Sequence, residues 1–291
     1  MFSISDSLYP ELFQAADKLA IDTQKKYFLY LRLYLVLLLS AAIISYQWQE
    51  TLFGDFSICF LFLIALCIFF FLQLKMPDSI WFEARVVAES IKTLIWRWMM
   101  HATPYQDEND EHRIHQDLKE IIAQHKELAS VFLASIETNE IITQKMNQIR
   151  NMKCSERKDY YMQYRIKDQH SWYVRKSEYN RTKGNNWFWI SICLHALAII
   201  FLGIRIFAFQ YQFPIEIFAT AAIFIHTWLQ AKKSNQLGIA YSLTANEIAT
   251  FLSEAESVQT EDKLSNFVVN SENAFSRKHT QYFYKHDVTY Y

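Results

Sequence analysis

Four runs of uncharged, mostly apolar residues constrain the fold of this 291-residue chain more than any other feature. They span 33–49, 56–74, 184–204 and 217–231, and each is 15 to 21 residues long. A helix that crosses a bilayer needs about 20 mostly apolar residues, and the fourth run approaches this length only with Glu216 near its start. The second and third runs are apolar on every face, which is rare for a helix of a soluble protein this size. We predict four transmembrane helices, with a buried soluble core helix as the alternative for each run.

The rest of the composition favours helices. The chain contains only 4 Gly and 4 Pro, well below the usual shares of about 7% and 5%. Folds with many strands and turns need both residues, so a β-rich fold is excluded. The four glycines are also too far apart to form a phosphate-binding loop. No Cys-x-x-Cys motif is present, so neither a zinc ribbon nor a disulfide framework is supported.

The predicted fold class is an all-α membrane protein, with four transmembrane helices as two hairpins plus a cytoplasmic helical bundle. Short connections around 47–55 and 210–214 join the runs in pairs. The chain is expected to divide into an N-terminal cytoplasmic helix (1–27), a first transmembrane hairpin (28–75), cytoplasmic helices (76–183), a second transmembrane hairpin (184–231) and C-terminal cytoplasmic helices (232–291). Within the cytoplasmic parts we expect helices over about 80–98, 112–136, 140–152, 156–183, 236–256 and 262–283.

Basic residues predict the orientation in the membrane. Cytoplasmic loops of membrane proteins carry an excess of Lys and Arg. The tip of the first hairpin has neither, and the second has only Arg205. Both termini and the central region are therefore expected in the cytoplasm. The basic residues that flank the runs on this side are Lys18, Lys25, Lys26, Arg32, Lys75, Arg175, Lys176, Arg181, Lys183, Lys232 and Lys233.

Two histidines lie inside predicted spans. His195 is in the third run and His226 in the fourth, and ionisable groups within a membrane usually face a bundle interior or a wet cavity. They are candidates for lining a pore or sensing protons, or they are neutral histidines hydrogen-bonded between helices. Arg205 and Glu216 flank the second hairpin tip. They are candidates to gate a pore mouth, or an interfacial pair that closes a turn.

Residues with catalytic or ligand-binding chemistry are sparse. His112 and His115 stand three apart, a marginal spacing for a zinc pair, and no His-Glu-x-x-His motif is present. The stretch 157–181 interleaves tyrosines and tryptophan with Arg and Lys, which suits a bound nucleotide or contact with anionic headgroups. No catalytic triad is identifiable. We expect no enzymatic activity, no cofactor, no metal and no nucleic-acid partner.

Several segments resemble one bacterial family. These are WFEARVVAESIKTLIWRWMMHATPY at 81–105, RKDYYMQYRIKDQHSWYVRKSEYN at 157–180, YSLTANEIATFL at 241–252 and ENAFSRKHTQYF at 272–283. They resemble motifs of the SLATT group, the SMODS- and SLOG-associating two-transmembrane effector domains, and the resemblance covers about residues 20–285 as two tandem copies. Lys278 and Tyr282 depart from the family pattern, which has Glu and Trp there.

The resemblance implies a cytoplasmic polar network and transfers no catalytic residue. We expect the charged family-matching positions to hold the two cytoplasmic halves together, because buried charges must be paired. Arg85 with Glu89 and Glu272 with Arg277 are candidate ion pairs. The network positions are Arg85, Glu89, Lys92, Arg165, Asp168, Asn180, Glu247, Glu272, Arg277 and His279.

The resemblance also implies a function. Such proteins are expected to be membrane-disrupting or pore-forming effectors of bacterial conflict systems, often beside nucleotide second-messenger synthases or sensors. We therefore expect a homo-oligomer in the lipid bilayer that permeabilises the inner membrane on a signal, with a nucleotide signal or a sensor protein as partner. The alternative is a non-conducting membrane scaffold or sensor that recruits a soluble partner through its cytoplasmic helices.

Overall fold

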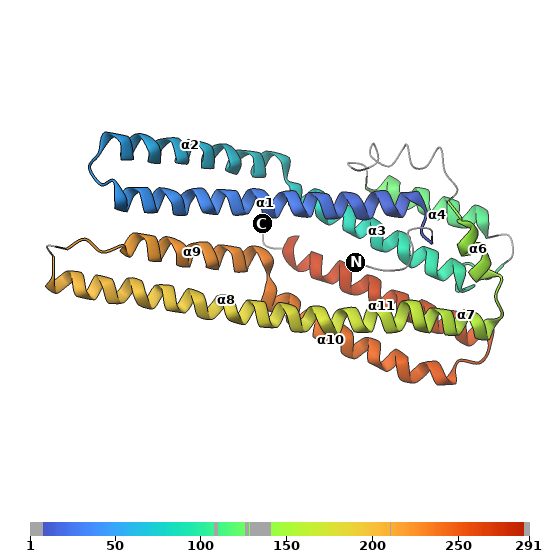
Figure 1. Cartoon of the computed structure of the whole chain (residues 1–291). Coiled ribbons are helices and arrows are strands. Elements are labelled where there is room, and N and C mark those ends of the chain that lie inside the picture. The colour runs from blue at the N-terminus through green and yellow to red at the C-terminus, as the bar shows by residue number, and fades with distance from the viewer. Residues whose placement is uncertain (1–7, 108–109, 126–127, 129–140, 210, 288–291) are drawn as a thin grey trace. The chain divides into compact units, whose positions relative to one another are not determined.

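The computed structural model describes residues 8–107, 110–125, 128, 141–209 and 211–287, and the side chains up to 276 (Figure 1). All secondary structure within these residues is helical, which confirms the all-α prediction. The elements are α1 (Glu11–Gln47), α2 (Leu52–Lys75), α3 (Pro77–Met99), α4 (Glu111–Gln124), α6 (Gln144–Arg150), α7 (Cys154–Tyr161), the π-helical turn η1 (Met162–Ile166), α8 (Lys167–Phe207), α9 (Ile215–Lys232), α10 (Ser234–Glu254), the 3₁₀ turn η2 (Ala255–Ser257) and α11 (Glu261–Asp287).

Three helical stretches of the described chain are long and apolar enough to cross a membrane. They are α1, the stretch Leu52–Met99 that includes α2, and the stretch Cys154–Phe207 that includes α8. The fourth predicted span, α9, is not among them. It is 18 residues long and carries Glu216 in its first turn and Lys232 in its last, so two charges lie within its length. Four transmembrane helices therefore remain a prediction.

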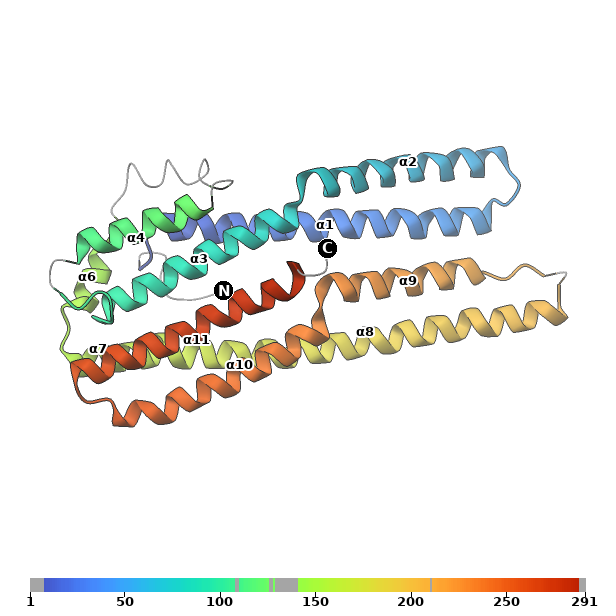
Figure 2. The ribbon, with the colours of Figure 1, turned by 180° about the vertical axis from the view of Figure 1, so that it is seen from behind.

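The apolar runs form the two expected hairpins. In both ribbon views α1 and α2 lie side by side and antiparallel, as do α8 and α9 (Figures 1 and 2). The turn between α1 and α2 is tight because the Thr51 hydroxyl caps α2 by accepting a hydrogen bond from the Gly54 amide at 3.1 Å. The Tyr46 hydroxyl donates to the Gln212 carbonyl oxygen at 3.4 Å, so the tips of the two hairpins lie at the same end.

A left-handed residue follows the return helix of each hairpin. Met76 has φ 37° and Lys233 has φ 50°, and each backbone N–H closes the last turn by donating to Leu72 or Leu229. A residue in this conformation ends a helix, and glycine is the usual choice because a side chain is strained there. Neither position has glycine. The break after Lys75 separates the first hairpin from α3, and the break after Lys232 separates the second hairpin from α10.

The chain forms two compact units. One comprises 1–24, 78–173 and 243–291, and we call it the polar unit; the other comprises 25–77 and 174–242, and we call it the hairpin unit. The core of the polar unit contains fully buried large side chains, among them Trp96, Ile91, Ile95, Tyr161 and Leu118. The hairpin unit buries little. Its helices expose large apolar side chains such as Phe60, Ile199 and Ile223, which is unfavourable in water and favourable in lipid.

Two predicted helices of the polar unit differ from the structure. The helix expected over 112–136 is α4, which ends at Gln124; residues 129–140 lie outside the described residues. The helix expected over 140–152 is shorter, because the Thr143 hydroxyl accepts a hydrogen bond from the Met146 amide at 3.2 Å and caps α6 there.

Candidate functional site

The polar unit contains a completely buried carboxylate with a full set of donors. Glu272 on α11 has no exposed surface. Arg165 binds it with two hydrogen bonds, from Nε to Oε1 at 2.8 Å and from Nη2 to Oε2 at 2.7 Å. The Tyr161 hydroxyl donates to Oε1 at 2.9 Å and the Thr93 hydroxyl to Oε2 at 3.0 Å. A buried charge with this many partners joins three parts of the sequence in one site.

Local helix geometry explains why the donors converge. Arg157, Tyr161 and Arg165 are spaced by four, so they follow one face of the continuous helix α7–η1–α8, and all three are buried. Arg165 lies in η1, the π-helical turn that widens this helix locally. Such turns occur frequently at functional sites. Helix α11 supplies Glu272 together with buried Phe275, whose ring lies 4.8 Å from the Arg165 guanidinium carbon.

A second set of charges lies on α3 of the same unit. Arg85 pairs with Glu89 at 2.8 Å, as the sequence suggested, and also with Asp17 of α1 at 2.8 Å. Lys92 donates to both oxygens of Glu89 at 3.3 Å and is itself buried. We call these residues with Arg165 and Glu272 the charge cluster. It holds three basic and three acidic side chains, Arg85, Lys92, Arg165, Asp17, Glu89 and Glu272, so its formal charge is zero.

The protonation equilibria of the cluster reflect its burial. Burial lowers the pKa of Lys92, and the Glu89 carboxylate only partly opposes this shift. Burial disfavours the charge of Arg165, but the Glu272 charge and its hydrogen bonds outweigh burial, and the pKa of Arg165 is raised. Burial and then the Glu272 charge raise the pKa of Tyr161 well above its usual value. Each oxygen of the Glu272 carboxylate therefore faces donors that keep their protons.

A further buried arginine was not predicted from the sequence. The Arg150 guanidinium donates to the backbone oxygens of Trp98, Tyr105 and Asp107, the last at 2.7 Å. Its central carbon lies 4.6 Å from the centre of the Trp98 ring. These contacts join the end of α3, the loop after it and α6. Since carbonyl oxygens provide most of the partners, no spacing of acidic residues could have indicated them.

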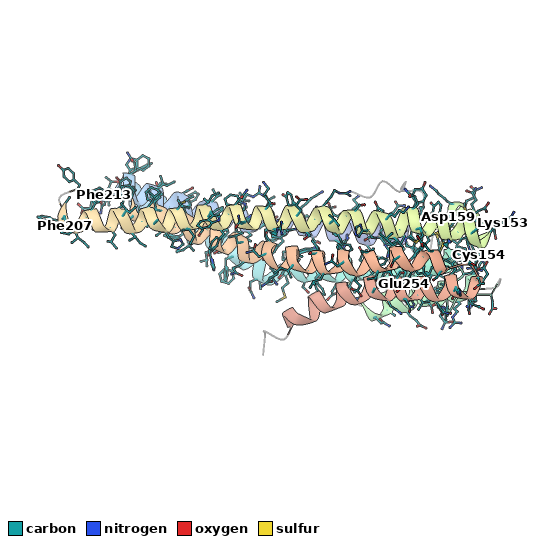
Figure 3. All side chains as sticks on the ribbon, turned by 90° about the horizontal axis from the view of Figure 1, so that it is seen from below. Lys153, Cys154, Asp159, Phe207, Phe213 and Glu254 are labelled. Atoms are coloured by element: carbon teal, nitrogen blue, oxygen red, sulfur yellow. The ribbon has the colours of Figure 1, made fainter. Side chains whose placement is uncertain are left out.

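Another buried arginine that was not predicted as a network residue connects α7 with α11 at one end of the polar unit. Arg157 pairs with Glu261, and Lys158 donates to the Val258 carbonyl oxygen at 3.1 Å. In Figure 3, Cys154 and Asp159 of α7 lie at the same end of this unit as Glu254 of α10. The repeated Arg-x-x-x-Tyr-x-x-x-Arg spacing at 157–165 was a signal that could have included Arg157 among the network residues.

Other predicted network residues lie elsewhere. Asp168 closely follows Arg165 in the sequence and is half-buried, but its Oδ2 has no hydrogen-bond partner among the described residues. Asn180 belongs to the hairpin unit and donates to the Lys176 carbonyl oxygen at 2.7 Å. Glu247 lies on α10. The side chains of Arg277 and His279 lie outside the described residues, so the expected Glu272–Arg277 pair stays a prediction; Glu272 pairs with Arg165.

The predicted intramembrane histidines lie on the surface of the hairpin unit. His195 is exposed, and one ring nitrogen bonds the Ser191 carbonyl oxygen at 2.8 Å. His226 is exposed on α9 and has no partner among the described residues. Arg205 and Glu216 approach to 4.0 Å but remain 53% and 65% exposed, and such exposed pairs contribute little stability.

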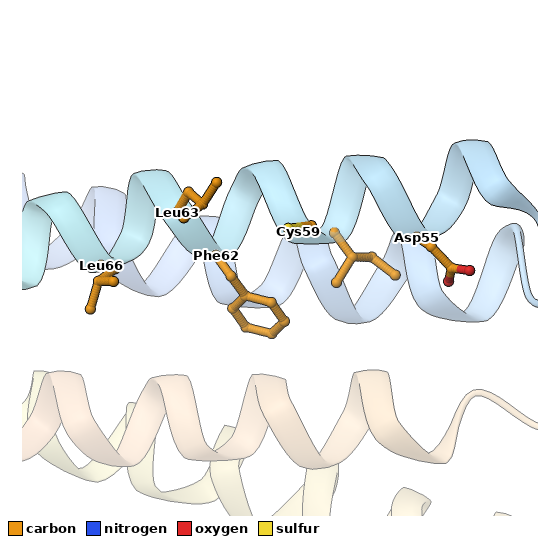
Figure 4. Close-up of a pocket in the computed structure, with 6 residues that line it drawn as sticks. Asp55, Cys59, Phe62, Leu63 and Leu66 are labelled. Atoms are coloured by element: carbon orange, nitrogen blue, oxygen red, sulfur yellow. The ribbon is translucent and has the colours of Figure 1, made fainter.

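Two more features of the hairpin unit concern its apolar surface. A shallow groove on α2 is lined by Ile58, Phe62 and Leu66, with Asp55 at one end (Figure 4). At the α8–α9 tip, where Figure 3 labels Phe207 and Phe213, Phe207 is 90% exposed. Both features leave apolar side chains available to lipid or to another protein surface.

Comparison with protein-family profiles identifies the family of this chain. A profile of the SMODS and SLOG-associating 2TM effector domain 3 matches residues 10–158. A profile of the SMODS and SLOG-associating 2TM effector domain 1 matches residues 161–282. The chain belongs to the SLATT family. The two matches confirm the tandem arrangement predicted from the motifs. A search of curated proteins and a search of solved structures each returned no significant match.

The SLATT assignment also clarifies the two units. SLATT domains are transmembrane effector domains associated with bacterial conflict systems. Each tandem SLATT domain contributes one hairpin to the hairpin unit and helices to the polar unit. Glu272 and Arg165 lie in the second SLATT domain and Thr93 in the first, so the Thr93–Glu272 hydrogen bond joins the two domains. In the described residues, no three His, Cys, Asp or Glu side chains are grouped to hold a metal ion.

Proposed function

We propose that this protein is a membrane effector that oligomerises and permeabilises the bacterial inner membrane when a signal releases its polar unit. The observation that carries the proposal is the pair of exposed histidines, His195 and His226, within the apolar hairpins. A polar ring in hydrocarbon is costly, so such side chains are normally covered by protein or water. Assembly of several copies would cover them and enclose a wet path.

The asymmetry of the hairpin unit supports a transmembrane placement. Its tips carry Glu50, Asp55 and Glu216 with Arg205 as their one basic residue, while Arg32 and Lys232 flank the opposite ends of the spans. This is the distribution expected when both tips face away from the cytoplasm. We propose that α9 crosses the membrane with the three longer helices, with both termini in the cytoplasm.

The charge cluster supports a resting state that can be switched. Its Arg165–Glu272 pair lies in the second SLATT domain and is bonded to Thr93 of the first, and a signal that opens this contact must overcome a finite free energy. We propose a nucleotide or a sensor protein as that signal. Charge reversal of the pair (Arg165→Glu with Glu272→Arg) is expected to change leakage or assembly, and unchanged behaviour in both would count against the switch.

The test of permeabilisation is dye release from vesicles of bacterial lipids that contain the purified full-length chain. Release is expected, and replacing both histidines (His195→Leu with His226→Leu) is expected to reduce it by about tenfold or more, since polar lining sustains a wet path. The matched control is Ile192→Leu with Ile223→Leu, three residues earlier on the same helices and also exposed. It should release dye as the natural chain does.

The same assay separates the proposal from its alternative. A non-conducting scaffold would release no dye under any condition that assembles it, and expressing cells would keep their membrane potential. That result, together with a soluble protein bound in stoichiometric amount to the polar unit, would refute permeabilisation.

A further inference from the structure

Two cations in the hairpin unit converge on one aromatic side chain without an acidic partner. The Arg32 guanidinium carbon of α1 and the Lys232 ammonium of α9 each lie 5.3 Å from the centre of the Trp228 ring. Lys232 also lies 3.3 Å from the centre of the Phe28 ring. Among the described residues, no carboxylate forms an ion pair with Arg32 or Lys232. Aromatic faces stabilise a cation only partly, so the site lacks a counter-ion.

The position of this site along the helices indicates what the counter-ion is. Arg32 directly precedes the first apolar run, and Lys232 directly follows the fourth. Phe28 and Trp228 contact each other at 5.7 Å between ring centres, which places the two span ends at one level. If the proposed membrane placement holds, this is the depth at which lipid phosphates lie, and Trp is typical of that depth.

We propose that Arg32, Lys232, Trp228 and Phe28 form a binding site for the phosphate of an anionic phospholipid headgroup. Basic sites between transmembrane helices on the cytoplasmic side are suited to such headgroups. Arg32 offers a planar fork of donors and Lys232 a compact charge. Because α1 and α9 come from different SLATT domains, the bound headgroup links the two hairpins. The inference rests on membrane insertion but not on permeabilisation.

The test is native mass spectrometry of the full-length chain released from detergent micelles, with phosphatidylglycerol or phosphatidylcholine of the same acyl chains. The natural chain is expected to retain phosphatidylglycerol preferentially. Replacing both cations (Arg32→Gln with Lys232→Gln) should reduce retention by about tenfold or more, as expected for two cations that contact a phosphate. Exchanging them (Arg32→Lys with Lys232→Arg) keeps both charges and should restore most of it.

The matched control removes two other charges of the same unit. Lys26 and Lys75 are exposed and near span ends, and Lys26→Gln with Lys75→Gln should leave retention within about twofold of the natural chain, since surface charges act diffusely. An equal loss in this control would overturn the site. Equal retention of the two lipids would also overturn it.

A third arm separates a lipid from a free anion. Inorganic phosphate added at millimolar concentration should leave phosphatidylglycerol bound, because the acyl chains add apolar contact that the ion lacks. Displacement by the ion would overturn the lipid assignment. Dye release and lipid retention are measured separately, so a chain that retains lipid but releases no dye would refute permeabilisation alone.

Discussion

Replacing Glu272 by Gln tests how much its buried ion pair with Arg165 stabilises the polar unit. The substitution keeps the shape but removes the charge that compensates buried Arg165. The new amide nitrogen also cannot accept from Arg165 or from the hydroxyl that shared its oxygen. Removing one partner of a buried ion pair typically costs about 3–5 kcal/mol of folding free energy, and we expect Glu272→Gln to fall in this range.

The magnitude is judged against a second Arg–Glu pair, in which only the carboxylate is exposed. Glu261 is 57% exposed and pairs with buried Arg157, which also donates to the Arg150 and Met152 carbonyl oxygens. Glu261→Gln should therefore cost less than Glu272→Gln, about 1 kcal/mol, the usual net contribution of one hydrogen bond. Equilibrium unfolding of the full-length chain in mixed micelles provides the measurement, followed by the fluorescence of the buried tryptophans Trp96 and Trp98.

A double substitution separates charge from shape. Combining Arg165→Met with Glu272→Gln removes both charges and leaves an amide oxygen that can still accept from Tyr161 or Thr93. The two single substitutions should together predict a larger loss of unfolding free energy than the double variant shows. The difference should be about 0.5–3 kcal/mol, the usual coupling of neighbours in one network. The reasoning is refuted if Glu272→Gln costs no more than Glu261→Gln, or if the two single effects simply add.

Three further predictions concern single positions. Burial, and then the charges of Arg150 and Arg157, lower the pKa of His101. The folded state therefore binds a proton at His101 less readily than the unfolded state does. The free energy of unfolding that this provides is present above about pH 6.5 and should be lost as the pH falls through the lowered pKa. His101→Gln should flatten that part of an unfolding-against-pH profile, and an unchanged slope would contradict it. Met76→Gly should raise the unfolding free energy by up to about 1 kcal/mol by relieving the left-handed strain; a lower unfolding midpoint would contradict it. Gly203, with nothing within 4 Å of an added Cβ, should gain about 0.5–1 kcal/mol as Gly203→Ala, and a loss of stability would show that this surface is covered.

Much of the fold follows from local sequence. The apolar runs determine the hairpins because length and polarity alone decide which segments suit a bilayer. Proline after Met76 marks a helix end that the structure has. The tandem SLATT assignment likewise follows from contiguous motifs, so no tertiary information was needed for it.

The partners within the site depended on tertiary structure. Periodicity indicates which residues share a helix face, but not which face of another helix lies opposite. The sequence suggested Arg277 as a partner of Glu272 but could not indicate Arg165, more than a hundred residues away, which packing places against Glu272. In the same way, the sequence placed His195 and His226 inside the apolar runs, and only the packing of the hairpins decided that both side chains point outward.

The sequence by itself determined the helical class, the apolar hairpins and the family, because each depends on neighbouring residues along the chain. The tertiary structure alone decided that Arg165 neutralises Glu272, that backbone oxygens hold Arg150, and that Arg32 and Lys232 meet at Trp228. Each of these depends on the rotation of one helix about its axis relative to another. That rotation is set by the packing of many side chains together, which no single segment encodes.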